Sequence, residues 1–343
     1  MRYYLLFILI VLLFSCSNNE NSKQYPIKVI LDTDMGSDCD DVGALALLNE
    51  YANQGKVNIL GVIYSSGAVP YGTGVIDAIN RYYDNDNIPI GANNDKSVGD
   101  SIDKMQTEKL SKDTAAFRNR YINNSDATEQ TELLRSILSN ENNENVIYIT
   151  IGHTKGLYDL LVSKPDSISE LSGFELVDKK IEKWIALGAL NAKNSNGYYV
   201  KDWNFFFNGT AKYTKYLVDS FPKPAYFVDA GSNIMTGKSL MNTPNGNIVR
   251  TAYRDWLWNV EKKTLGDQRP SWDLMAVYFA VEKPTKYFSI FENGYLDFNV
   301  EKGCKWIVND TVTQQHYVLQ NQGYESELSD YLNKMICKPN YEK

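Results

Sequence analysis

Residues 27–41 read IKVILDTDMGSDCDD, an apolar run followed at once by five aspartates within ten residues. The run Ile27–Leu31 is apolar on both faces, as strands of a buried parallel sheet are. Apolar residues then recur at helical spacing from Val42 to Asn53. In open α/β sheets, ligands bind outside the carboxyl ends of the strands, in loops of this kind. The segment therefore predicts both a fold class and the place of a site.

The same alternation of short apolar runs and helical patterns continues for two hundred residues, which predicts an α/β fold with a mostly parallel, Rossmann-like sheet flanked by helices. Further strands are predicted at Val57–Tyr64, Val146–Ile151, Lys183–Gly188 and Ala225–Asp229. Further helices are predicted at Gly72–Tyr83, Glu129–Leu138, Lys155–Val162, Thr210–Asp219, Asn247–Val260, Leu274–Val281 and Ser326–Cys337. The polar stretch 92–123 is expected to be an insertion or a surface subdomain. Because no linker cuts the pattern, residues 26–343 are predicted to form a single domain.

Residues 32–41 contain five aspartates, an unusually high density of carboxylates. Carboxylates packed so closely raise one another's pKa unless a cation neutralises them. A hard divalent ion with oxygen ligands, Ca²⁺ or Mg²⁺, would do so, although the spacing lacks the glycine and glutamate of an EF-hand. The ordinary alternative is a solvated turn before a helix, where Asp40 and Asp41 would suit the helix dipole. That alternative accounts for two of the five acids, so we predict a metal site.

Composition excludes several other kinds of chemistry. The 343 residues hold 35 Lys+Arg against 42 Asp+Glu, a formal charge of -7. An acidic chain without a basic block argues against a nucleic-acid partner. The two histidines, His153 and His316, and the four cysteines do not fall at zinc-ligand spacing. Catalysis in this protein must therefore rest on carboxylates.

The amino terminus has the pattern of a secretory signal. A charged start and a short apolar run lead to Leu13-Phe14-Ser15-Cys16, which resembles a bacterial lipobox. We expect residues 1–15 to be a lipoprotein signal peptide, Cys16 to carry lipid, and 16–25 to be a flexible tether. The protein would then be a lipoprotein of the bacterial cell envelope, periplasmic or surface-facing. The alternative is an ordinary signal peptide with an incidental cysteine.

Asp-x-Asp-x-Gly followed by Asp-Asp, directly after an apolar first strand, resembles the inosine/uridine-preferring nucleoside hydrolases. In that family the acidic loop binds Ca²⁺ and supplies an aspartate that activates water. The loop of this chain is two residues longer than the usual form. The resemblance implies that Asp34 and Asp41 are calcium ligands and that Asp40 is the catalytic base, with Asp38 competing for either role.

Three later segments resemble the family in the same order, over about residues 27–285. The strand ending at Ile151-Gly152 implies that the carbonyl of Ile151 is a calcium ligand. Residues 201–205 (KDWNF) resemble a Glu-Phe-Asn segment, which implies that Asp202, Trp203 and Asn204 contact the sugar. Residues 270–276 (PSWDLMA) resemble a His-Asp-Pro motif, which implies that Asp273 is the distal calcium ligand. Each has an ordinary alternative: a strand end, a turn, and a first-turn aspartate after a Ser271 cap.

Two departures from the family pattern concern the leaving-group end of the site. The family histidine before the distal aspartate is Trp272, which can stack on a planar leaving group but cannot donate a proton usefully. The family's Gly-Asn after the second strand is Gly67-Ala68, with Ser65 and Ser66 as the nearest polar substitutes, and we expect Ser66 to contact the substrate. The metal and sugar half of the pocket is therefore expected to be kept, and the base half changed.

The resemblance implies a calcium-dependent hydrolase of N-glycosidic bonds in ribonucleosides or related ribosides. It also implies a homodimer or homotetramer that meets the membrane only through its lipid. One alternative is a non-catalytic, calcium-dependent sugar- or nucleoside-binding lipoprotein, since the histidine is missing. Another is a haloacid-dehalogenase-like phosphatase, because a strand followed by Asp32-x-Asp34 also opens that family's site.

Overall fold

The computed structural model describes residues 26–282, 285–311 and 314–337. The predicted signal peptide, the predicted lipidation site Cys16 and the predicted tether up to residue 25 lie outside these ranges. Among the described residues, no helix combines the length and the apolarity needed to cross a membrane.

A nine-stranded sheet forms the centre of the protein, in the order β10-β13-β7-β6-β5-β1-β2-β3-β4. Neighbouring strands run parallel except for the antiparallel pair β10 and β13. The strands are β1 (Ile27–Thr33), β2 (Val57–Tyr64), β3 (Ile90–Ala92), β4 (Thr128–Glu129), β5 (Val146–Thr150), β6 (Ile181–Leu187), β7 (Ala225–Asp229), β10 (Phe288–Phe291) and β13 (Gln315–Gln320). The predicted fold class, a mostly parallel sheet flanked by helices, is thereby confirmed.

The strand order reverses at β1. The chain moves outward through β2, β3 and β4 and then returns to the other side of β1 with β5. In the register of this pair Asp32 lies opposite Thr150, so the two strands end side by side. The loops that follow β1 and β5 therefore leave the sheet at a topological switch point, where open α/β sheets form their ligand crevice.

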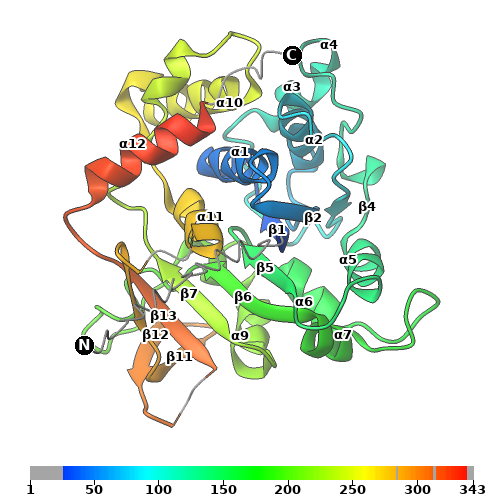
Figure 1. The fold of residues 1–343 in the computed structure, drawn as a ribbon, viewed down its shortest axis with the longest axis vertical. Helices are drawn as coiled ribbons and strands as arrows, with labels where there is room; N and C mark the ends of the chain where they lie inside the picture. Colours follow the sequence, from blue (N-terminus) through cyan, green and yellow to red (C-terminus); the bar gives the residue numbers. More distant parts are fainter. Residues whose placement is uncertain (1–25, 283–284, 312–313, 338–343) are drawn as a thin grey trace, which may run out of the picture.

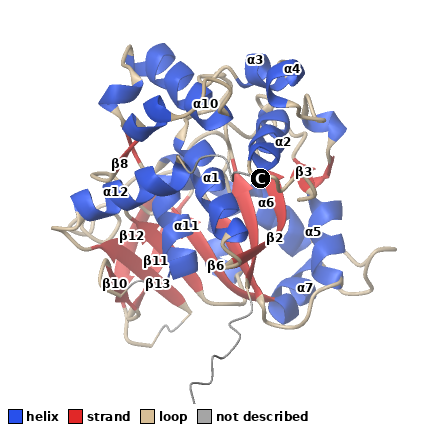
Figure 2. Cartoon of the chain, turned by 45° about the horizontal axis from the view of Figure 1, so that its top comes forward, coloured by secondary structure: helices blue, strands red, loops and turns tan. Residues whose placement is uncertain are grey.

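Helices cover both faces of the sheet, as Figures 1 and 2 show. Val29 and Leu31 of β1 belong to one core cluster and Ile30 to the other, because successive side chains of a strand point to opposite faces. The first cluster includes residues of α1 (Asp40–Asn53), α2 (Gly72–Tyr82), α10 (Ile248–Trp256), α11 (Trp272–Glu282) and α12 (Glu325–Ile336). The second includes residues of α5 (Gln130–Ser139), α6 (Lys155–Val162), α7 (Gly173–Lys180) and α9 (Ala211–Ser220).

The remaining elements are short. They are α3 (Thr107–Lys112), α4 (Thr114–Phe117), α8 (Trp203–Phe206), the antiparallel pairs β8 (Met235–Thr236) with β9 (Arg269–Pro270) and β11 (Gly294–Asn299) with β12 (Gly303–Val308), and the 3-10 turns Asn124–Asp126, Lys238–Asn242 and Leu265–Asp267. The stretch 92–123 holds α3 and α4, and its Met105 and Leu110 are buried in the first core cluster. It is therefore packed onto the main core rather than set apart from it.

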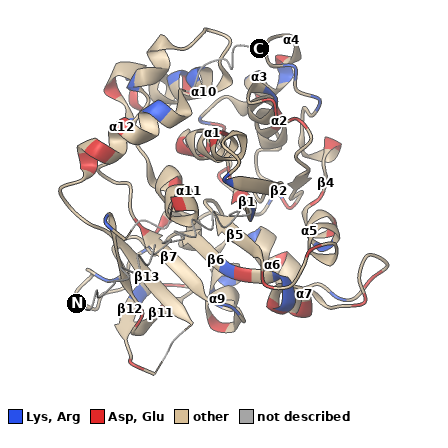
Figure 3. Ribbon diagram, in the orientation of Figure 1, with Lys and Arg blue, Asp and Glu red and all other residues tan. Residues whose placement is uncertain are grey.

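The five predicted strands and eight predicted helices are all present, with ends shifted by at most a few residues. The largest shift is in the helix expected at Asn247–Val260. It ends as an α-helix at Trp256 and continues as a π-helical segment, Leu257–Glu261. Such wide turns often occur at functional sites. Figure 3 shows that Lys and Arg are interspersed with Asp and Glu along the ribbon.

Candidate active site

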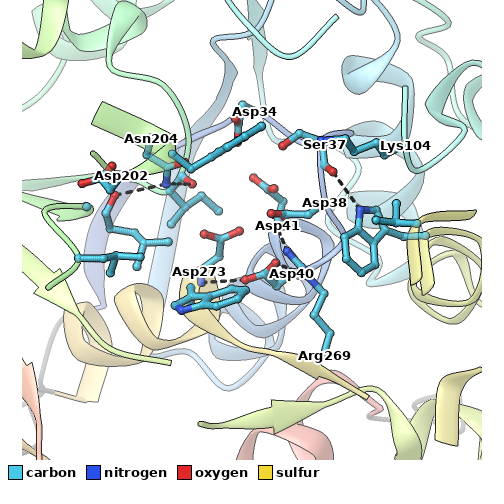
Figure 4. A pocket seen from close by; sticks show the side chains of 18 residues that line it. Asp34, Ser37, Asp38, Asp40, Asp41, Lys104, Asp202, Asn204, Arg269 and Asp273 are labelled. Carbon is cyan, nitrogen blue, oxygen red and sulfur yellow. Dashed lines mark hydrogen bonds and ion pairs between the residues drawn. The ribbon is translucent and has the colours of Figure 1, made fainter. Parts of the chain in front are cut away.

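A cavity of about 300 Å³ opens at the carboxyl ends of β1, β5 and β6. Its volume is at the lower end of the range for small-molecule sites. Ten of the predicted site residues line it: Asp34, Asp38, Asp40, Asp41, Ile151, Asp202, Trp203, Asn204, Trp272 and Asp273. They come from the loop after β1, the start of α1, the end of β5, the start of α8 and the start of α11. Figure 4 shows their carboxylates gathered around one central space.

Two glycines allow the loop after β1 to approach the end of β5. Gly36 has a φ of 127°, a backbone conformation that side chains with a Cβ rarely adopt. At Gly152, a Cβ atom would lie 2.3 Å from the backbone nitrogen of Asp34. Any larger residue there would push Asp34 away from the strand end. This close approach explains why Asp34 and Ile151 share the cavity although they are far apart in the sequence.

The almost fully buried carboxylates of the cavity include Asp34, Asp41 and Asp273. The hydroxyl of Thr33 donates a hydrogen bond to Oδ1 of Asp41, which fixes the orientation of that carboxylate. Burial, and then the charges of the neighbouring aspartates, raise the pKa of all three groups well above the usual value. Without a cation, the cluster can therefore not be fully ionised at neutral pH.

Asp38 and Asp40 differ from the other three because Arg269 contacts both. Its Nη2 lies 2.7 Å from Oδ2 of Asp38, and its Nε donates to Oδ1 of Asp40 at 2.9 Å. The backbone nitrogen of Asp273 donates to the other oxygen of Asp40 at 3.3 Å. Burial and the charge of Asp38 raise the pKa of Asp40 to about 7. Burial is the largest influence on Asp38 and opposes its ionisation, but Arg269 and the neighbouring side chains of Asp40 and Asp41 together lower the pKa of Asp38.

Arg269 is held between two indole rings. Its guanidinium carbon lies 3.9 Å from the ring centre of Trp256 and 5.3 Å from that of Trp272. Nε1 of Trp256 in turn donates to the carbonyl of Ser37 at 2.9 Å. Arg269 and Trp256 line the cavity, although neither is among the residues that the sequence predicts for the site. The sequence feature that could have indicated Arg269 is its position four residues before the predicted ligand Asp273.

The donor set of the cavity fits a hard divalent cation. Oδ2 of Asp34 and Oδ1 of Asp38 are buried without a hydrogen-bond partner. Among the described residues, Asp38, Asp40 and Asp273 place one carboxylate oxygen each within 4.8 Å of the others. Carboxylate and carbonyl oxygens are the ligands of Ca²⁺ and Mg²⁺. This cluster differs from the predicted ligand set by including Asp40 and by leaving out Asp34 and Asp41. Each oxygen of Asp40 already accepts a hydrogen bond, whereas Oδ1 of Asp38 accepts none, so Asp38 is the more available ligand of the two.

Asp202 and Asn204 organise the loops on the opposite side of the cavity. Asp202 caps α8 by accepting from the backbone nitrogen of Phe205 at 2.8 Å, and it also accepts from that of Ala189. Burial raises the pKa of Asp202 to about 6. Nδ2 of Asn204 donates to the carbonyl of Ile151 at 2.8 Å. A carbonyl oxygen accepts twice, so Ile151 keeps one lone pair for a ligand.

Two polar residues near the cavity do not line it. Ser66 is buried after β2, and the structure does not bring it to the cavity, so the expected substrate contact of Ser66 lacks support. His153 is fully buried, with Nε2 3.2 Å from Oδ2 of Asp34. Burial lowers the pKa of His153 to about 4, so the ring is neutral at pH 7. Among the described residues that line the cavity, none is a histidine, tyrosine or cysteine.

No family model matches the sequence, and no curated protein matches it. Solved structures are similar in fold. The inosine-uridine preferring nucleoside hydrolase from Bacillus anthracis has a TM-score of 0.63 at 13% identity, over 90% of this chain and 99% of that one. A plant nucleoside hydrolase has a TM-score of 0.61 at 13% identity, over 92% and 100%. The type III effector protein XopQ, solved with adenosine diphosphate ribose, has a TM-score of 0.60 at 13% identity, over 92% and 94%. The chain thus has the nucleoside hydrolase fold.

Proposed function

We propose that this protein is a calcium-dependent hydrolase of the N-glycosidic bond in ribonucleosides or related ribosides. The observation that carries the proposal is the buried carboxylate cluster at the switch point of a nucleoside hydrolase fold. Asp34 and Asp38, each with a buried oxygen that accepts no hydrogen bond, line the same cavity as Asp202 and Asn204. Carboxylates that would bind a cation therefore line the same cavity as polar side chains that would hydrogen-bond the hydroxyls of a sugar.

The residues that would hold the cation are Asp34, Asp38, Asp41, Asp273 and the carbonyl of Ile151. A bound divalent cation lowers the pKa of water and orients it for attack. Water that attacks the face opposite the leaving group would invert the configuration of the sugar carbon, as in inverting glycosidases. The chain must then supply a base for the proton of that water.

We assign the role of base to Asp38, in addition to its contact with the cation, and not to Asp40. Both oxygens of Asp40 accept hydrogen bonds, from Arg269 and from the backbone of Asp273. Asp38 has one oxygen on Arg269 and a second, buried oxygen without a partner. General-base catalysis by a positioned carboxylate contributes about 10²–10⁴-fold. At the leaving group, Trp272 offers stacking on a planar ring instead of a proton.

The proposal is tested by incubating purified protein with inosine, uridine and synthetic ribosides, with and without Ca²⁺. We expect Ca²⁺-dependent release of the base or aglycone and free ribose. At saturating Ca²⁺ we expect the substitution Asp38→Asn to lower turnover by about 10²–10⁴-fold, since the base is lost while the amide oxygen can still contact the cation.

The matched control is Asp255→Asn. Asp255 is also a largely buried aspartate paired with an arginine, Arg254, but it does not line this cavity. Its variant should keep wild-type turnover. An equal loss in both variants would remove Asp38 from the role of base.

A second candidate function is calcium-dependent binding of sugars or nucleosides without catalysis. It is favoured by the lack of histidine, tyrosine and cysteine among the described residues that line the cavity. The same incubation separates the two functions. Calcium-dependent binding of ribose analogues without turnover of any riboside would replace the hydrolase by a binding protein.

We also propose that the protein is anchored to the cell envelope through lipid on Cys16, which follows the lipobox-like Leu13-Phe14-Ser15. The expressed chain should then partition into the detergent phase, and the variant Cys16→Ala should remain in the aqueous phase. Identical partitioning of the two proteins would count against the anchor.

A further inference from the structure

We propose that Arg269 is a positioning residue of the site, which holds Asp38 and Asp40 in place so that the acidic cluster can bind its cation. The inference rests on the proposed calcium site. It concerns a residue that acts through the two carboxylates that it contacts, Asp38 and Asp40.

Arg269 links three separate parts of the chain. Asp38 and Asp40 lie in the loop after β1 and at the start of α1, and Arg269 itself lies in β9. Its guanidinium packs on Trp256 at the end of α10, whose indole hydrogen-bonds the carbonyl of Ser37 in the same loop. Hydrogen bonds and ion pairs from Trp256 and Arg269 thus hold the acidic loop at Ser37, Asp38 and Asp40. Figure 4 shows Arg269 reaching toward both aspartates from outside the ring of carboxylates.

The side chain of Arg269 has the burial and the contact geometry needed to hold two carboxylates. It is only 7% exposed, and its two carboxylate contacts leave from different nitrogens of the guanidinium. The planar fork of arginine can contact two carboxylates in fixed directions and stack on an aromatic face at the same time. A lysine carries the same charge at a single point and cannot do both. The geometry of Arg269, and not only its charge, is therefore the feature that the site uses.

Charge and positioning predict opposite effects on cation affinity. If Arg269 acted only as a charge, its removal would make the cavity more negative and Ca²⁺ binding tighter. If Arg269 positions the loop, its removal frees Asp38 and Asp40 to move away from Asp34, Asp41 and Asp273, to which they are like-charged neighbours. Binding then becomes weaker although a positive charge has been lost. The sign of the change distinguishes the two roles.

The test is the Ca²⁺ affinity of the metal-free full chain, measured by titration calorimetry for wild type, Arg269→Gln and Arg269→Lys. We expect Arg269→Gln to bind Ca²⁺ at least about tenfold more weakly, the range found when groups that orient metal ligands are removed. Arg269→Lys should remain weaker than wild type, because it restores charge without the fork. The control Arg254→Gln removes an arginine from another aspartate pair, Arg254–Asp255, and should leave the affinity unchanged.

Unchanged or tighter binding in Arg269→Gln would overturn the proposal, and so would wild-type affinity in Arg269→Lys. If Arg269→Gln does not fold, as judged by circular dichroism, the lysine variant alone decides. A wild-type protein that binds Ca²⁺ but hydrolyses no riboside would refute the proposed hydrolase and leave the role of Arg269 to the calorimetry. Where turnover is present, Arg269→Lys should lower kcat by about a hundredfold with little change in KM, since a displaced base misplaces water and not the sugar.

Discussion

Replacing Asp41 by alanine should abolish specific Ca²⁺ binding and, with it, hydrolysis. Asp41 is 1% exposed, and its carboxylate is oriented by the hydroxyl of Thr33. Loss of a group that merely orients a ligand costs about 10–100-fold in metal affinity, so loss of a ligand should cost at least about a hundredfold. The remaining acids, Asp34, Asp38 and Asp273, would then offer the cation fewer of the carboxylate oxygens that it requires. Titration calorimetry of Ca²⁺ into the metal-free variant measures the effect.

The control for Asp41→Ala is Asp255→Ala, which removes a largely buried aspartate outside the cavity. This variant should bind Ca²⁺ as wild type does. Asp41→Asn is informative as well, because the amide keeps the hydrogen bond to Thr33 possible but removes the negative charge. Calcium affinity that survives in Asp41→Ala would show that the ion, if bound, is held by a different set of oxygens.

The predicted strands were found because each carries its own signal. β1, β2, β5, β6 and β7 are apolar runs buried in the middle of the sheet. β3 and β4 have three and two residues, too few for a periodic pattern to show. β10 and β13 extend the far edge by an antiparallel pairing that depends on how the C-terminal third of the chain packs. Local patterns predict the centre of a sheet better than its edges for this reason.

The site shows the same division between local and distant information. The aspartates of the loop after β1 can be recognised from the sequence because five of them fall within ten residues. Arg269 is 229 residues away from Asp40 in the sequence, and nothing near it marks its partner. Ser66 is close in sequence to the family position, yet it is buried after β2 and does not line the cavity. Sequence spacing can therefore predict a cluster of acids that are close together along the chain. It cannot predict an ion pair between residues that only the folded structure brings together.

The metal-free protein should lose stability as the pH rises, and Ca²⁺ should restore it most at alkaline pH. Burial and neighbouring charges raise the pKa of Asp34, Asp41 and Asp273, and raise that of Asp40 to about 7. A group whose pKa is higher in the folded than in the unfolded state favours folding below the unfolded pKa, and this contribution is lost as the pH rises through the folded pKa. The loss therefore begins near the usual carboxyl pKa and extends through neutral pH. Asp38 and His153, whose pKa values are lowered, work in the opposite direction but are fewer than the four aspartates.

Calcium reverses this dependence because its ligands must be deprotonated to bind it, and binding to the folded state alone stabilises that state. We expect the rise in Tm on adding Ca²⁺ to chelator-treated protein to be larger at about pH 8 than at about pH 5, by roughly 5 °C. Differential scanning calorimetry across this range measures both curves. The Asp41→Ala variant serves as the control, since its Tm should not respond to Ca²⁺ at either pH. A calcium-induced rise as large at about pH 5 as at about pH 8 would mean that the buried aspartates are not the groups that bind the ion.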